Sequence, residues 1–145
     1  MQMPNVVYRL LSHRFLAVTW TNIIFILLAL PGKMLPDENK LAVPQLDKLV
    51  HIVLFGTFVF LWSFYFAASG KKRNLRRLFL RMVLIACLYG TAMEFIQKYF
   101  IPNRDFDVLD IAADVVGALA GYGVVSLLMK AIRFGEDKNR TQSKK

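Results

Sequence analysis

Four blocks of apolar residues, separated by short polar segments, set the pattern of this chain. They cover about residues 14–30, 49–68, 78–100 and 108–130. A helix needs about 20 apolar residues to cross the hydrocarbon core of a bilayer, with a usable range of roughly 17 to 25. Backbone groups in lipid must pair within their own segment, which favours helices over strands. The pattern predicts an all-α integral membrane protein, a bundle of four transmembrane helices within residues 1–135. The polar, basic tail, 136–145, is predicted to be disordered.

Composition supports the membrane class. It argues against a nucleic-acid-binding protein and against a protein held together by disulfides or a cysteine metal site. Hydrophobic residues make up 56% of the 145 residues, and the formal net charge is +9. The basic residues flank the apolar blocks, where they face lipid head groups, so we expect no nucleic-acid partner. The single cysteine, Cys87, lies inside an apolar block and allows neither an internal disulfide nor a multi-cysteine metal site. No small-x-small cleavage site follows the first block, which we expect to be retained as a helix.

The charged residues divide unevenly between the two sides of the predicted membrane. Fourteen of the nineteen lysines and arginines lie on the side that holds both chain ends and the loop between the second and third blocks. Eight of the ten acidic residues lie on the other side. Lysine and arginine favour the cytoplasmic side, so the pattern predicts a protein of the cytoplasmic membrane with both termini in the cytoplasm.

Polar residues gather where three of the predicted helices reach the outer side. They are Lys48 and His51 at the start of the second helix, Glu94 and Gln97 late in the third, Arg104 and Asp107 in the following loop, and Asp110 and Asp114 at the start of the fourth. With a rise of 1.5 Å per residue, Glu94 and Asp114 each lie about 9 Å inside their helix ends, too deep for a short side chain to reach water. At 100° per residue these side chains share helix faces with small or aromatic residues, which predicts one site open to the outside. Gly117 and Gly121 form a GxxxG pair, which predicts close helix packing.

Several of these residues also admit a purely structural role. Asp110 could be a charge favoured by the dipole at a helix N-terminus. His51 could be an interfacial histidine, and Glu94 could form a structural ion pair with Arg104. Charged residues inside a membrane span are energetically costly and usually functional. We therefore favour a functional site over the alternative in which none of the four charged residues has a functional role: Glu94, Arg104, Asp110 and Asp114.

Taken together, the pieces resemble the VanZ-like family of small bacterial membrane proteins. The resemblance covers roughly residues 30–125. It rests on Asp47-Lys48-Leu49-Val50-His51, Glu94-Phe95-Ile96-Gln97, Arg104-x-Phe106-Asp107-x-x-Asp110 and Asp114-x-x-Gly117-x-x-x-Gly121. Asp114 departs from the pattern, because the family often has asparagine there. The family takes its name from a protein that gives bacteria low-level resistance to teicoplanin, so the resemblance implies a role at the cell envelope, in the bacterial inner membrane.

The first functional hypothesis is recognition of a membrane-bound molecule, either a lipid-linked cell-wall precursor or a lipoglycopeptide. Arg104 would grip a phosphate or carboxylate bidentately, and Lys48 would add a second positive charge. The remaining ligand-binding residues would be Gln97, Asp107 and Asp110. Membrane lipids are the expected partners, and the sequence is compatible with an oligomer.

Two other hypotheses stay open, so the sequence does not decide whether a reaction is catalysed. In an intramembrane enzyme, Glu94 or Asp114 would be the general base and His51 a proton shuttle. In a structural or assembly scaffold, the charged residues would form ion pairs that only hold the helices together. Transport is disfavoured because the polar residues stop in the outer half of the spans. We expect no cofactor. The ligand types of His51, Glu94 and the aspartates suit Mg²⁺ or Ca²⁺ better than zinc, but only one histidine is available there.

Overall fold

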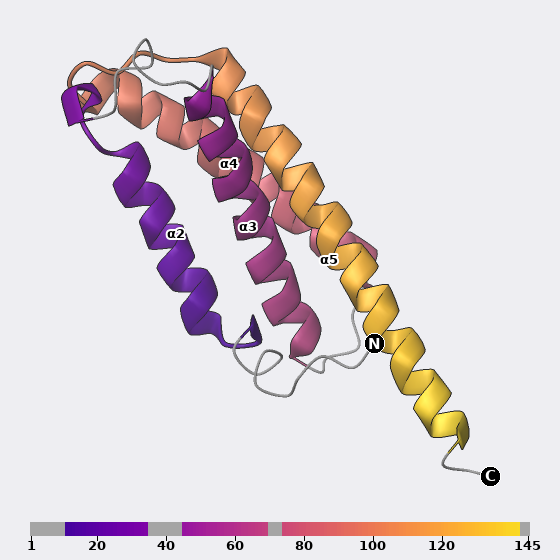
Figure 1. The fold of residues 1–145 in the computed structure, drawn as a ribbon. Coiled ribbons are helices and arrows are strands. Elements are labelled where there is room, and N and C mark those ends of the chain that lie inside the picture. Colours follow the sequence, from indigo (N-terminus) through magenta and orange to yellow (C-terminus); the bar gives the residue numbers. More distant parts are fainter. Residues whose placement is uncertain (1–10, 35–44, 70–73, 143–145) are drawn as a thin grey trace.

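The computed structural model describes residues 11–34, 45–69 and 74–142, and all regular structure in this part of the chain is helical. The elements are α2 (Arg14–Leu28), the 3-10 turn η1 (Gly32–Met34), α3 (Leu46–Ala68), α4 (Leu75–Phe100) and α5 (Val108–Gln142), as Figure 1 shows. The predicted all-α fold is confirmed. Three of these helices, α3, α4 and α5, are long and apolar enough to cross a membrane, and α2 is a shorter apolar helix. The chain is therefore a multi-pass membrane protein.

Helix α2 is shorter than the span predicted over residues 14–30. It has 15 residues, or about 22 Å at the helical rise, against a hydrocarbon core of about 30 Å. The N–H of its C-cap residue, Ala29, folds back onto carbonyls of the last turn, and Pro31 follows two residues later. Proline has no N–H to donate and its ring clashes with the preceding turn, so it ends the helix.

Three other helix bounds differ from the prediction, and one of them is the start of α4, at Leu75 and not at about residue 78. Helix α3 begins at Leu46, which places Asp47 and Lys48 inside its first turn. Helix α5 continues to Gln142, through positions 136–142 of the tail that the sequence predicted to be disordered, while 143–145 lie outside the described residues. Extending a formed helix adds one hydrogen bond per residue without new nucleation, and the polar residues there include good helix formers.

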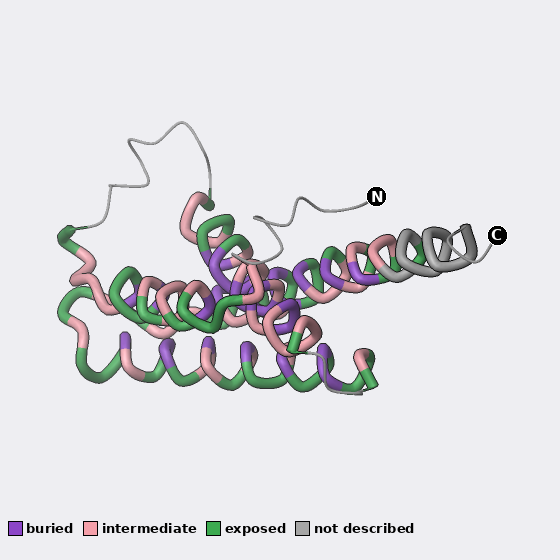
Figure 2. The backbone as a smooth tube through the Cα atoms, turned by 90° about the horizontal axis from the view of Figure 1, so that it is seen from below, coloured by how far each residue is buried: buried purple, intermediate pink, exposed green. Residues whose placement is uncertain are grey.

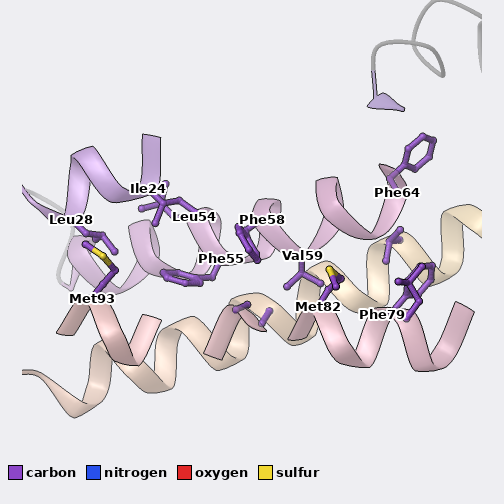
Figure 3. Packing of buried hydrophobic residues seen from close by; sticks show 14 of the residues in the cluster. Ile24, Leu28, Leu54, Phe55, Phe58, Val59, Phe64, Phe79, Met82 and Met93 are labelled. Atoms are coloured by element: carbon purple, nitrogen blue, oxygen red, sulfur yellow. The ribbon is translucent and has the colours of Figure 1, made fainter. Parts of the chain in front are cut away.

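Helix α3 is the centre of the bundle and packs against α2, α4 and α5. Ile24, Leu28 and Met93 join α2, α4 and the start of α3 at one end of the apolar core, as Figure 3 shows. Toward the other end, Val59 of α3 lies beside Met82 of α4. Figure 2 shows the buried residues turned toward neighbouring helices and the exposed ones turned outward. In a membrane protein these exposed apolar side chains face lipid.

Helices α3 and α5 touch backbone to backbone at their glycines. A Cβ added at Gly117 would meet the backbone of Ile52, and one added at Gly121 would meet the backbone of Gly56. Small residues of this kind let two helices approach closely in a membrane. This contact fixes the spacing of α3 and α5 directly below the polar residues at their ends.

Three hydrogen bonds of aromatic side chains help attach helix α2 to the bundle. Trp20 Nε1 donates to the carbonyl of Leu54 at 2.9 Å, and Trp62 Nε1 donates to Thr21 Oγ1 at 3.0 Å. The hydroxyl of Tyr89 donates to the carbonyl of Thr21 at 3.1 Å. These bonds give the polar tips of aromatic side chains a partner where water is absent.

Candidate functional site

The end of α4 and the starts of α3 and α5 meet at one end of the bundle, which we call the polar end (upper left in Figure 1). The loops join there as well, because Gly32 N–H donates to the carbonyl of Pro102 at 3.2 Å. Gln97 is buried and donates through Nε2 to the carbonyl of Leu28 at 2.9 Å. Gln97 therefore ties α4 to the last turn of α2 and supplies a partner for a carbonyl that the helix end leaves open.

Lys48 is the only cation that the described residues place among the carboxylates of the polar end. Its Nζ lies 2.8 Å from Asp47 Oδ2, 2.8 Å from Asp107 Oδ2 and 2.9 Å from Asp110 Oδ1. Its side chain is 17% exposed, and that of Asp110 is 9% exposed. An ammonium group has three protons to donate, and these three contacts use all of them. Lys48 thus binds the start of α3 to the start of α5.

Asp107 precedes the first residue of α5 and receives two kinds of donor. The hydrogen bond from Lys48 holds the pKa of the Asp107 carboxyl below its usual range, and the N–H of Leu109, donating to Oδ1 at 2.7 Å, lowers the pKa further. This is a side-chain bond to the first turn of the helix. Asp107 therefore stays ionised where α5 begins.

His51 and Asp114 form a buried pair between α3 and α5. His51 Nδ1 lies 2.8 Å from Asp114 Oδ1, and the exposed fractions of the two side chains are 3% and 1%. A carboxylate only accepts hydrogen bonds, so with Asp114 ionised the Nδ1 of His51 carries the proton. The other ring nitrogen, Nε2, lies 3.8 Å from Asp110 Oδ2. The histidine is thus held at one nitrogen and open at the other.

Gly90 of α4 makes the room for this pair. A Cβ added at Gly90 would collide with the carboxylate of Asp114. We had not predicted a role for Gly90 in the site, although its place on the same helix face as Glu94 was the available signal. The side chain of Asp114 reaches from α5 to the surface of α4 only because this residue is glycine.

Glu94 is fully buried, and one of its two oxygens is held. Oε2 accepts from the backbone N–H of Asp107 at 2.9 Å. For Oε1 the described part of the chain offers no hydrogen-bond partner, and the same is true of Asp114 Oδ2. Two buried acceptor atoms of ionisable groups are therefore open at the polar end. Leaving such atoms unpaired is expensive, which makes each of them a candidate contact for a ligand.

The structural ion pair between Glu94 and Arg104, which the sequence left open as an alternative, is not found among the described residues. Arg104 is half-buried in the loop before α5, and its Nε has no hydrogen-bond partner in the described part of the chain. The backbone of Asp107 takes the place beside Glu94 that the ion pair required. Arg104 is therefore not used by the charge cluster.

The structure brings six of the predicted site residues into one cluster: Lys48, His51, Glu94, Asp107, Asp110 and Asp114. Gln97 points instead to α2. We had not predicted a site role for Asp47, the third carboxylate on Lys48, although it lies in the first of the quoted motifs. Acidic groups outnumber basic ones in this cluster, so its interior favours hydrogen-bond donors and cations over anions.

A helical bundle with three membrane-length helices defines a multi-pass membrane protein, and this one has a buried charge cluster at one end of the bundle. The comparison with known families gives the particular family: the VanZ/LLP1 family model matches residues 2–129. The chain belongs to the VanZ/LLP1 family, as its motifs predicted. Comparison with curated proteins and with solved structures returned no match.

Proposed function

We propose that the chain is a four-span protein of the cytoplasmic membrane that binds the polar head of a membrane-embedded envelope molecule at its polar end. In this proposal the polar end faces outside and both termini lie in the cytoplasm, where fourteen of the nineteen lysines and arginines would then lie. Helix α2 is the fourth span. Its shortness is accommodated by local thinning of the bilayer, which costs fractions of a kcal/mol per ångström of mismatch.

The observation that carries the proposal is the set of open, buried acceptor atoms between α4 and α5. Glu94 Oε1 and Asp114 Oδ2 are excluded from solvent and have no partner in the described part of the chain. Hydroxyl, amide and ammonium groups are the donors that complete such acceptors. The heads of lipid-linked cell-wall precursors and of lipoglycopeptides are sugars and peptides, which are rich in these donors.

The two basic residues of the site have different parts in this proposal. Lys48 already contacts three carboxylates, so it organises the cluster and is not open to an anion. Within the described residues, Arg104 makes no hydrogen bond or ion pair with the cluster, and its Nε has no hydrogen-bond partner. A guanidinium group binds phosphate or carboxylate bidentately. The carboxylate oxygens inside the site thus accept hydrogen bonds from the bound molecule, and Arg104 at the edge of the site binds the anionic group of the same molecule.

Native mass spectrometry in a mild detergent tests this proposal. We expect wild-type protein to retain a discrete adduct that is lost in Glu94→Gln and weakened in Arg104→Ala. Lys33→Ala is the matched control, because Lys33 is an exposed basic residue in η1, beside the polar end. An adduct retained equally by all four proteins, or found in none of them while all are folded, would overturn the proposal and leave a structural or assembly scaffold.

The pair formed by His51 and Asp114 favours an intramembrane enzyme as a second candidate. A carboxylate that holds one ring nitrogen fixes the tautomer and leaves the other nitrogen ready to move a proton. Glu94 is the second acid–base group in this candidate. Turnover of membrane lipids by the purified protein, followed by mass spectrometry of the products, tests it. An enzyme predicts product with wild type and none with His51→Gln, whereas equal results for the two proteins exclude this chemistry.

A further inference from the structure

We propose that His51, Glu94 and Asp110 form a binding site for one divalent transition-metal ion of the zinc or manganese class. One potential ligand atom from each of these buried residues lies within 4.8 Å of the other two. The sequence argued against a metal because only one histidine was available. The structure changes that argument, since it brings the histidine and two carboxylates from three different helices to one point.

Each of the three side chains is held at one atom and open at the other. His51 is held at Nδ1 by Asp114, which leaves Nε2 open. Asp110 is held at Oδ1 by Lys48, and Glu94 is held at Oε2 by the N–H of Asp107. A purely structural network would be expected to use both atoms of such groups. Among the described residues the second atoms make no hydrogen bond, and Nε2 of His51 faces Oδ2 of Asp110 at 3.8 Å, which is an arrangement that suits ligands around one ion.

The contact of His51 with Asp114 is the kind that metal-binding histidines make. A ligating histidine almost always donates its other ring N–H to a carboxylate, a backbone carbonyl or a water. That contact fixes the tautomer, so the lone pair of Nε2 points away from Asp114. The Nε2 atom of His51 lies 3.8 Å from Asp110 Oδ2. Two ligand atoms on a tetrahedral zinc ion lie about 3.4 Å apart, so a shift of roughly 0.4 Å brings both into coordination.

Glu94 supplies an independent observation that points to an ion. Its Oε1 is fully buried and lacks a hydrogen-bond partner within the described residues. An ionised carboxylate oxygen without a partner in a membrane span is strongly unfavourable. A metal ion removes this penalty, because it gives the open oxygen a ligand bond and offsets the negative charge of two carboxylates.

The neighbouring acidic group is not the site. Asp47, Asp107 and Asp110 also lie close together, but Lys48 occupies the space between them. A cation there would meet the ammonium group. The three-ligand set, with one imidazole and two carboxylates, leaves at least one position open to water or to a ligand. Imidazole suits zinc and other transition metals, and carboxylates suit manganese.

The test uses the metal alone, so its result is independent of whether the protein also binds a lipid. Protein purified in detergent is stripped with a chelator and titrated with ZnCl₂ or MnCl₂. We expect about one ion per chain, a rise in Tm, and a bound-Mn²⁺ electron paramagnetic resonance signal with modulation from an imidazole nitrogen. Glu94→Gln and Asp110→Asn should each weaken binding by about tenfold or more.

Asp105→Asn is the matched control, because it removes an exposed carboxylate in the loop before α5 that the proposed site does not use. It should bind the ion like wild type. Should Glu94→Gln fail to fold, Asp110→Asn decides. The proposal is overturned by absence of stoichiometric binding in folded wild-type protein, by equal weakening in Asp105→Asn, or by a Mn²⁺ signal without nitrogen modulation.

Discussion

The two ends of this bundle are held together by different physics. At the polar end, ion pairs and hydrogen bonds join α3, α4 and α5, and all the ion pairs found in the described residues lie there. At the other end, which we call the apolar end, Phe64, Phe79 and Met82 belong to the apolar core, as Figure 3 shows. Lipid tails are as apolar as these side chains, so apolar contact alone gives helices little preference for one arrangement. The comparison indicates that the positions of the helices relative to one another are set by the polar end and by the glycine contact between α3 and α5.

The largest effect is expected from removing the charge of Lys48. Lys48→Met keeps most of the side-chain volume but leaves Asp107 and Asp110 facing each other without a cation. Breaking a fully buried ion pair on one side costs about 3–5 kcal/mol, and because Asp107 is 40% exposed we expect a loss at the lower end of that range, about 3 kcal/mol, in the free energy of unfolding. Equilibrium unfolding in mixed micelles measures it. Lys98→Met, at an exposed lysine of α4, should have little effect, and a similar loss in both would mean that the cluster does not organise the fold.

A smaller loss is expected from the glycine contact that lies between the two ends. Gly121→Ala places a methyl group against the backbone of Gly56, which cannot yield as a side chain can. Overpacking of this kind costs about 1–3 kcal/mol. The control is Gly123→Ala, because a Cβ there meets nothing within 4 Å. If the two variants unfold alike, the close approach of α3 and α5 does not contribute to stability.

The bond between α4 and α2 comes next. Gln97→Leu removes the side-chain N–H that donates to the carbonyl of Leu28, so that carbonyl loses this hydrogen bond. One such hydrogen bond contributes about 1 kcal/mol. Asn22→Leu is the comparison, since the exposed amide of Asn22 donates to a carbonyl of its own helix. Unfolding monitored by Trp20 fluorescence should report a loss for the first variant alone. No change in either would show that α2 is held by its aromatic contacts.

The smallest effect is expected at the apolar end. Ser63 is fully buried, and its hydroxyl has no hydrogen-bond partner within the described residues. Ser63→Ala removes an unsatisfied polar atom without leaving another behind, so the free energy of unfolding should change by less than about 0.5 kcal/mol or rise slightly. A loss above about 1 kcal/mol would contradict the description of this end as apolar packing.

The sequence predicted the helices and their inward faces well, because both follow from local periodicity. Residues on one face of α4 and one face of α5 had to meet a neighbour, and the quoted motifs placed them at the same end. It failed where the outcome depended on partners from another helix. The three carboxylates on Lys48, the choice of a backbone N–H over Arg104 as the partner of Glu94, and the turn of Gln97 toward α2 are decided by distances between helices. The length of α5 was missed for another reason, since composition alone understates how easily an existing helix extends.

The backbone contact of Gly117 and Gly121 with α3 divides the site into a fixed part and a movable part. His51, Asp110 and Asp114 all stand on α3 and α5, whose backbones already touch and have no space left to close. Glu94 stands on α4, which meets the site through side chains, with Gly90 against the carboxylate of Asp114. Any change in the width of the site therefore requires α4 to tilt, while α3 and α5 stay in contact. For the ligand binding that we propose, a tilt of α4 would tighten or loosen the site around the bound molecule.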